Sequence, residues 1–419
     1  MMISFTMPVR SSLILAGRSF FAIFQLLLFQ VIFSSLSGQA VNTIPKGKVP
    51  VHQVDITDIL RIGHGSKHDS DSTSDRGKGP FISVIPVVGY GRNTGITGVL
   101  SSSTTFYSDT ARKRMSRIQF NANYSQYHQY WFTLLNNVFF DDRKLHLFGD
   151  IRYYKFPTQT YGLGPFSKNA HEIHIDYSYL RFWETVFIEL GTNFYVGAGY
   201  NLDYHWNIKA DTVKTTEMDQ FLEYQKGHSS LSSGVSVNLL YDSRKNSVNP
   251  KGGSYINIQV RHNLKFLGSD QNWQVLLVDL RKYFRLPGSS DNILAFWSYN
   301  NVVLSGIAPY LDLPSIGWDS YSNTGRGYVP GRYTGRVLLY MESEYRFRLM
   351  RNGLLGGVVY GNVGSIPAKV PKEMAPLIPG GGLGLRIKIN KHSDTNLAVD
   401  YSFGLRKSRG FTFNLGEMF

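Results

Sequence analysis

An arginine set between glycines is the first feature of this sequence that could do chemistry. It lies in a long segment without strand periodicity, in the motif Gly325, Arg326, Gly327 and Tyr328. Glycines permit tight folding and close backbone approach. A buried guanidinium needs a carboxylate partner, and Glu342 and Glu344 follow on the polar face of the next predicted strand. We interpret the motif as a loop folded into the protein interior, with a flexible surface loop as the alternative.

Patterns for catalysis or metal binding are weak by comparison. The chain has no cysteine, which excludes thiolate zinc sites and a cysteine nucleophile. His171 and His174 are three residues apart, whereas the helical zinc-protease motif needs two histidines four apart. His64 and His68 lie among aspartates, but in a polar stretch that is typical of a solvated segment. We therefore expect no enzymatic activity, no metal site and no cofactor.

Composition and charge narrow the class of protein. Charged residues make up 18% of the 419 residues and aromatic residues 14%. Soluble domains average ~25% charged residues, and aromatic girdles at two membrane interfaces would account for the aromatic excess. A very aromatic soluble core has the same composition, so this observation alone does not decide. The net charge is +14, but Lys and Arg are spread along the chain. We therefore expect no nucleic-acid partner, and contacts with outer-membrane lipid and lipopolysaccharide headgroups instead.

The first eighty residues predict an exported protein. Arg10 and Arg18 precede an apolar core at 20–33, and small residues follow near Ala40. This order is typical of a signal peptide, and the core is shorter than the ~20 residues of a spanning anchor helix. We assign residues 1–40 to the signal peptide and 41–80 to a short, flexible, polar periplasmic segment. Within it, 54–62 has the pattern of a short amphipathic turn or helix.

From Phe81 onward the hydrophobic pattern has period two, which indicates strands. Between Arg336 and Leu349, four charges (Glu342, Glu344, Arg346 and Arg348) fall on one face and none on the other. A soluble sandwich also alternates, but its strands average ~5–6 residues, whereas tilted membrane-spanning strands need ~9–11. A Lys or Arg on a lipid-facing position costs ~2–4 kcal/mol, which fits charge confined to one face.

The fold class predicted is all-β, a transmembrane antiparallel β-barrel of about 16 strands over residues 81–419. The strands are expected near 81–90, 96–109, 116–129, 130–140, 145–156, 171–189, 193–208, 229–242, 253–263, 272–286, 291–305, 336–349, 354–365, 380–390, 395–406 and 410–419. An even number is the rule for bacterial single-chain barrels. The longest connections, 209–228 and 306–335, are the ones expected to carry function.

Two further motifs complete the pattern. A strand ends, a Pro/Gly-rich turn follows and a new strand begins at the turn motif Asp242, Arg244, Pro250 and Gly253. The final stretch places four apolar residues on one face: Phe411, Phe413, Leu415 and Phe419.

Together these motifs resemble the bacterial surface antigen family, the BamA/TamA-type outer-membrane β-barrels, in a short, Bacteroidetes-like form. The Gly325–Tyr328 motif is similar to the tip of that family's sixth extracellular loop. The resemblance implies that Glu342, Glu344 or Asn362 partners the loop arginine, where Asn362 stands in place of an aspartate. It also implies that the final stretch is a C-terminal assembly signal read by the barrel-assembly machinery. About 40 residues precede the barrel after cleavage, so POTRA domains are not expected and a separate periplasmic partner protein is.

The resemblance implies a role in inserting or translocating outer-membrane protein or lipid. The mechanism expected is a weak lateral seam between the first and last strands, where Gly416 weakens the pairing. Unpaired strand edges can template an incoming strand. The alternatives are a pore or passive transporter with a loop-plugged lumen, and a structural surface antigen or anchor.

Overall fold

The computed structural model describes residues 53–56, 58–59, 80–91, 94–108, 114–140, 144–167, 171–211, 214–286, 292–369 and 375–419. The predicted signal peptide, residues 1–40, lies outside them, as does most of the predicted periplasmic segment. No helix in these ranges is long and apolar enough to cross a membrane.

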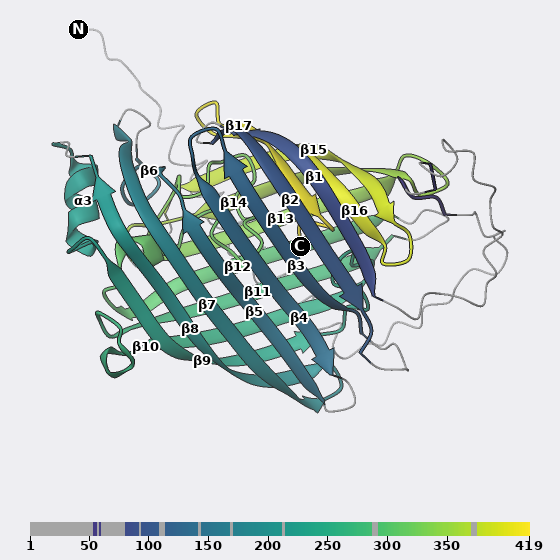
Figure 1. The fold of residues 1–419 in the computed structure, drawn as a ribbon, viewed down its shortest axis with the longest axis horizontal. Helices are drawn as coiled ribbons and strands as arrows, with labels where there is room; N and C mark the ends of the chain where they lie inside the picture. Colours follow the sequence, from purple (N-terminus) through teal and green to yellow (C-terminus); the bar gives the residue numbers. More distant parts are fainter. Residues whose placement is uncertain are drawn as a thin grey trace, which may run out of the picture.

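Sixteen of the strands form one nearly closed antiparallel barrel (Figure 1). Their bounds are β1 (Phe81–Gly91), β2 (Gly95–Phe106), β3 (Ser116–Ser125), β4 (Tyr130–Phe140), β5 (Leu145–Lys155), β7 (Ile173–Gly191), β8 (Phe194–Ala210), β9 (Ser230–Asp242), β10 (Gly253–Asn263), β11 (Trp273–Arg285), β12 (Ile293–Gly306), β13 (Val337–Arg348), β14 (Leu355–Ser365), β15 (Leu377–Asn390), β16 (Thr395–Gly404) and β17 (Arg409–Leu415). The predicted fold class and strand number are confirmed.

The two ends of the barrel differ in their connections. One end, the long-loop end, carries residues 156–172, 211–229 and 307–336, and the other, the short-turn end, carries shorter turns. The long-loop end holds a short strand, β6 (Thr158–Thr160), one helix, α3 (Thr216–Tyr224), and the 3-10 turn η3 (Tyr310–Asp312); a second 3-10 turn, η2 (Lys265–Leu267), joins β10 to β11. Sequence periodicity predicted none of these four elements.

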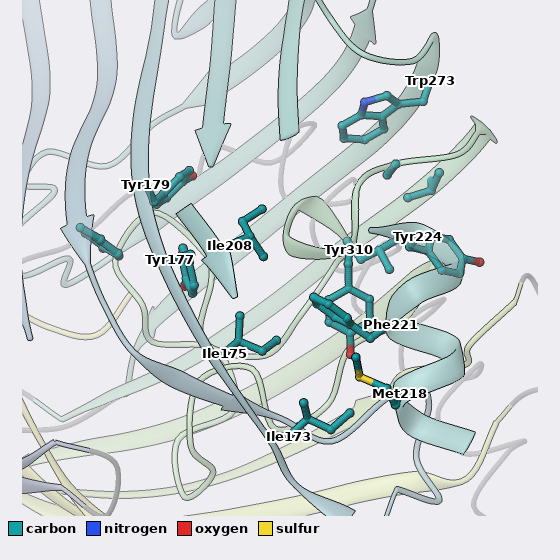
Figure 2. Packing of buried hydrophobic residues seen from close by; sticks show 14 residues of the cluster. Ile173, Ile175, Tyr177, Tyr179, Ile208, Met218, Phe221, Tyr224, Trp273 and Tyr310 are labelled. Atoms are coloured by element: carbon teal, nitrogen blue, oxygen red, sulfur yellow. The ribbon is translucent and has the colours of Figure 1, made fainter. Parts of the chain in front are cut away.

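The helix α3 begins where a side chain can satisfy its first amides. The hydroxyl of Thr215 accepts a hydrogen bond from the amide of Met218, which caps the helix. Met218 and Phe221 then pack on Ile173, on the upper end of β7, and on Tyr310 of the long loop (Figure 2). This cluster closes the long-loop end with apolar side chains, so burial here holds the loop 307–336 in place.

The two faces of the strands separate charge from apolar surface. Large hydrophobic side chains are exposed on the outside, among them Val84, Leu100, Val237, Leu383 and Phe403. Ion-paired residues line the inside, including Asp150, Arg152, Arg181, Asp203 and Arg261, all buried. This is the alternation of a barrel with a lipid-facing exterior and a polar interior.

The barrel wall is not closed by strand pairing around its whole circumference. Each wall strand pairs with the next along the chain, from β1–β2 to β16–β17. β17 and β1 lie side by side (Figure 1), and a Cβ on Gly89 would lie 3.6 Å from the Phe413 ring, but no strand ladder joins them in the described part of the chain. Lower on β1, Phe81 stacks on His392 of the β15–β16 turn, 5.6 Å between ring centres.

The last four residues turn into the barrel instead of extending β17. Gly416 has a φ of +100°, a conformation that favours glycine. Phe419 is buried and stacks on Trp297, an inward residue of β12, with ring centres 5.2 Å apart. The prediction that Phe419 shares one face with Phe411, Phe413 and Leu415 is therefore wrong, because the strand ends at Leu415 and the chain changes direction at Gly416.

A short piece of the segment before the barrel contacts the short-turn end. Asp55 and Asp58 exchange side-chain hydrogen bonds with each other's amides, at 3.1 and 3.0 Å. Both then bind Lys391 in the β15–β16 turn, and the Val54 amide donates to the carbonyl of Asn352. The segment expected to be flexible is therefore docked on the barrel at this point.

The separation of faces predicts opposite results for two charged substitutions on paired strands. Val237→Arg places a cation on the exposed outer face of β9 and should reduce stability by ~2–4 kcal/mol. Gln259→Lys places a cation on the inward face of β10, beside a polar cavity, and should change stability little. Urea unfolding in lipid vesicles, followed by heat-modifiable gel mobility, measures both; equal losses would contradict the assignment of faces.

Candidate functional site

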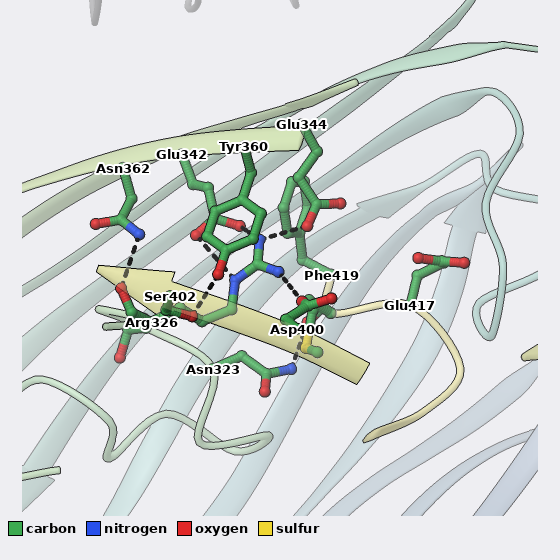
Figure 3. Close-up of polar contacts among 12 residues, drawn as sticks. Asn323, Arg326, Glu342, Glu344, Tyr360, Asn362, Asp400, Ser402, Glu417 and Phe419 are labelled. Carbon is green, nitrogen blue, oxygen red and sulfur yellow. Dashed lines mark hydrogen bonds and ion pairs between the residues drawn. The ribbon is translucent and has the colours of Figure 1, made fainter. Parts of the chain in front are cut away.

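Arg326 lies at the centre of a buried ionic cluster (Figure 3). Its guanidinium donates hydrogen bonds to Glu342, Glu344 and Asp400, and all four side chains have at most 1% exposure. The guanidinium carbon also lies 3.6 Å from the centre of the Tyr360 ring. Burial alone would lower the pKa of Arg326, but these carboxylates outweigh it and raise the pKa well above its ordinary value.

The carboxylates reach the lumen because side chains alternate between the two faces of a strand. Glu342, Glu344 and Arg346 are successive inward residues of β13, so they project into the lumen one above another. Arg346 donates to Glu344 at 2.7 Å. Arg386 of β15 binds Asp400 of β16, and so extends the cluster across four neighbouring strands, β13 to β16.

The loop residues around Arg326 make close contacts with the strands of the barrel wall. Gly327 has a φ of +102°, and a Cβ there would lie 2.7 Å from the carbonyl oxygen of Phe403, so the loop touches β16 where only glycine fits. The Tyr328 hydroxyl donates to the carbonyl of Pro379. The Asn362 side chain donates to the carbonyl of Arg326 at 3.2 Å, so it contacts the loop backbone and not the guanidinium.

The inward-turned tail joins the same cluster. Glu417 accepts a hydrogen bond from Arg386 at 2.6 Å and from Asn396 at 2.7 Å. Asn323 of the loop donates to the carbonyl of Met418 at 2.7 Å. The loop, the tail and four wall strands are thus held by one connected set of polar contacts.

The turn motif closes the short-turn end. Arg244 makes a two-pronged contact with Asp242 at 3.0 and 2.9 Å, which fixes the turn as it leaves β9. Pro250 is buried within the turn, and Gly253 begins β10 with a φ of +97°. Between Arg244 and Pro250, Val248 is fully buried, and its carbonyl accepts a hydrogen bond from the Glu417 amide at 2.8 Å. The turn therefore reaches across the lumen to the tail.

A second ionic chain lines the other side of the lumen. Arg152 binds Asp150 at 2.7 Å and also donates to the carbonyl of Asp319 in the loop at 2.9 Å. Arg181 bridges Asp150 and Asp203 at 3.2 and 3.0 Å. The long loop is therefore tied to both sides of the barrel.

A cavity remains between the long loop and β17, the last strand of the wall. It measures about 370 Å³ and is bounded by inward residues of β2 to β5, by residues 317–330 of the loop and by 411–415 of β17. Its β2–β4 wall is uncharged, with Ser101, Gln119, Asn121 and Thr133. No group of three His, Asp or Glu residues that could hold a metal ion is found in the described ranges.

Comparison with known families identifies the fold. The family profile described as the Omp85 superfamily domain matches residues 111–419. The chain belongs to the Omp85 superfamily. It is accordingly a bacterial outer-membrane β-barrel of the BamA/TamA type. Because such barrels have short periplasmic turns and longer extracellular loops, we assign the long-loop end to the extracellular side. The resemblance noted in the sequence is confirmed.

Solved structures support the same fold. BamA from Haemophilus ducreyi lacking POTRA domains 1–3 is similar with a TM-score of 0.50 and 15% identity, over 79% of this chain and 68% of that one. CdiB from Escherichia coli gives 0.52 and 11%, over 80% and 61%. CdiB from Acinetobacter baumannii gives 0.50 and 12%, over 81% and 60%. The chain thus spans about three fifths of either CdiB chain. No curated protein sequence matches this chain.

Sequence reasoning missed three members of the cluster, Asp400, Arg386 and Glu417. Asp400 lies on the polar face of its predicted strand, but it stands 74 residues from Arg326, and no local signal joins them. Glu417 was hidden because the last strand was extended through Gly416. Two features of the sequence could have indicated Asp400 and Glu417. Asp400 alternates onto the polar, lumen-facing side of its strand, and a glycine stands three residues before the final phenylalanine.

Removing the loop arginine should destabilise the barrel. Arg326→Ala leaves three buried carboxylates without their shared partner, which should cost ~3–5 kcal/mol. Arg409→Ala, at an exposed position of β17, is the matched control and should change stability little. Urea unfolding in vesicles measures both, and an Arg326→Ala barrel as stable as the control would contradict the cluster's role.

The stability of the folded barrel should also depend on pH, through Asp312 of the long loop. Burial, with the charge of Asp203, raises the pKa of Asp312 to about 8, and the Ser232 hydroxyl donates to this carboxyl at 2.6 Å. The native state therefore holds a proton that the unfolded chain, with an ordinary pKa of ~3.9, releases. Stability from this group is present below pH ~4 and falls, by up to ~1.4 kcal/mol per unit, as the pH rises to about 8.

The test compares the wild type with Asp312→Asn, which cannot release a proton. Unfolding midpoints in urea between pH 5 and pH 8 should fall more steeply for the wild type than for the variant. Parallel curves would show that Asp312 is ionised in the folded barrel.

Proposed function

We propose that this barrel inserts or translocates proteins or lipid at the outer membrane, through a lateral seam between β1 and β17. The observation that carries the proposal is the missing ladder between these two strands. In lipid, unpaired backbone groups are costly, so an edge of this kind is expected to pair with another strand when one is presented.

The shape of β17 supports this proposal. It has seven residues, against eleven for β1, because the chain turns inward at Gly416. The lower part of the β1 edge therefore faces the β15–β16 turn instead of a strand partner. The cavity that borders β17 from inside, whose β2–β4 wall is uncharged, provides room next to the seam for a segment of a client.

The filled lumen favours this role over the alternative, a pore or passive transporter. The long loop, the tail and the β9–β10 turn all cross the interior, and each is anchored by buried hydrogen bonds. In this proposal the cluster around Arg326 braces the barrel, so that the seam is the part free to change. The role requires no catalytic residue.

Partners belong to the proposal as well. The barrel-assembly machinery would insert this chain, with Phe411 and Phe413 on the outer face of β17 as part of its signal. A periplasmic partner protein would deliver clients to the short-turn end, where Val54, Asp55 and Asp58 already contact the barrel.

Locking the seam tests the proposal. The natural chain has no cysteine, so Gly89→Cys with Phe413→Cys, a pair in contact across the seam, can be joined by a short bis-maleimide. In vesicles holding the protein, folding of an added small outer-membrane barrel should fall to the rate seen without it.

A second pair controls for the chemistry. Val237→Cys with Val260→Cys joins β9 to β10 at directly opposite positions, away from the seam and from the cavity beside it, and this crosslink should leave the rate unchanged. Full activity of the seam-locked barrel would rule out the lateral route, and channel conductance of the same vesicles would then test the pore reading.

A further inference from the structure

The outer wall carries a cleft at the extracellular end that the proposed function does not use. It measures about 550 Å³ and is bounded by the β3–β4 turn and by the ends of β6, β7 and β8 at the long-loop end. This volume is within the ~300–1,000 Å³ range of ligand pockets.

Strand register places the polar side chains of the cleft on the outside. Gln159 of β6 lies opposite His174 of β7, and Asp176 of β7 lies opposite Lys209 of β8. Directly opposite residues share a face. Their neighbours Ile173 and Ile175 point the other way, into the buried cluster under α3, with 1% exposure. The four polar side chains therefore form one outward patch.

The cleft is preformed, and its polar groups are available. The buried side chain of Gln129 donates to the carbonyl of Pro157 at 2.5 Å, which holds the β3–β4 turn against the β6 side of the cleft. The buried side-chain oxygen of Gln159 has no hydrogen-bond partner. Within the described residues, the side chains of His174, Asp176 and Lys209 also form no hydrogen bond or ion pair, although Asp176 and Lys209 lie opposite each other.

An aromatic patch continues the same face toward the membrane. Its rings are in contact across β4, β5 and β8, with centres 5.0–6.5 Å apart, and they are Tyr130, Phe132, Tyr153, Tyr204 and Trp206. Along β8, Trp206 is three residues below Lys209, which corresponds to ~10 Å. Aromatic girdles mark the membrane interface of such barrels, so the cleft lies just above the outer leaflet.

We propose that this cleft binds the saccharide headgroup of an outer-leaflet glycolipid such as lipopolysaccharide, with its acyl chains along the aromatic patch. Amide, imidazole and carboxylate groups match sugar hydroxyls, as donors and acceptors without strong net charge. Lys209 would meet an anionic substituent, and the exposed ring of Tyr127 offers a flat apolar surface at the rim.

Retention of glycolipid by the purified barrel tests the proposal. Wild-type protein is purified in mild detergent, incubated with rough-form lipopolysaccharide, and bound molecules are counted by native mass spectrometry. The triple variant His174→Ala, Asp176→Ala and Lys209→Ala should bind about tenfold more weakly, the effect of losing one or two hydrogen bonds. Lys265→Ala, an exposed cation on the β10–β11 loop, is the control and should bind as the wild type does.

All three positions are exposed, so folding should survive, and heat-modifiable mobility verifies it. The site could recognise a free saccharide or the headgroup of a membrane glycolipid, and the core oligosaccharide released from the lipid distinguishes the two. The oligosaccharide should bind much more weakly than the intact glycolipid. Equal retention by the triple variant and the wild type would overturn the site. Equal binding of oligosaccharide and glycolipid would overturn the assignment to a membrane lipid.

Discussion

Every backbone amide and carbonyl inside a bilayer needs a partner, and this requirement shapes the whole molecule. Fifteen neighbouring pairs of the sixteen wall strands satisfy it with continuous antiparallel ladders, from β1–β2 round to β16–β17. Closure would require one further ladder, between β17 and β1. The shortness of β17 follows from the inward turn at Gly416, so the place where the requirement is unmet is built into the sequence.

The wall lacks a ladder between β1 and β17 in the described part of the chain, and polar contacts inside the lumen hold the loop and the tail in place instead. Arg326 binds carboxylates from β13 and β16, Arg386 links these to Glu417 in the tail, and Asn323 ties the tail back to the loop. A buried cluster of this kind adds little net stability over an apolar core, but it is strongly destabilised when one member is removed. Its contribution is a defined position for the loop and the tail while the seam lacks a ladder.

The sequence predicted what depends on alternation alone. Period-two patterning located the sixteen strands and placed Glu342, Glu344 and Arg346 on one face. It could not join Asp400 to Arg326, because the approach of β16 to the loop depends on barrel closure. It also extended the last strand through Gly416, because alternation carries no information on where a chain turns. The helix α3 was missed since its packing on Tyr310 is a tertiary contact.

Amide hydrogen exchange in lipid nanodiscs can test directly whether β1 has a free edge. The matched comparison is β9, a wall strand paired on both sides with β8 and β10. If the β1 edge is free, alternate amides of β1, those directed at β17, should exchange much faster than the amides of β9 at the same depth. Equal protection of the two strands would mean that β1 is paired along both edges in the membrane, which would contradict a lateral seam between β1 and β17.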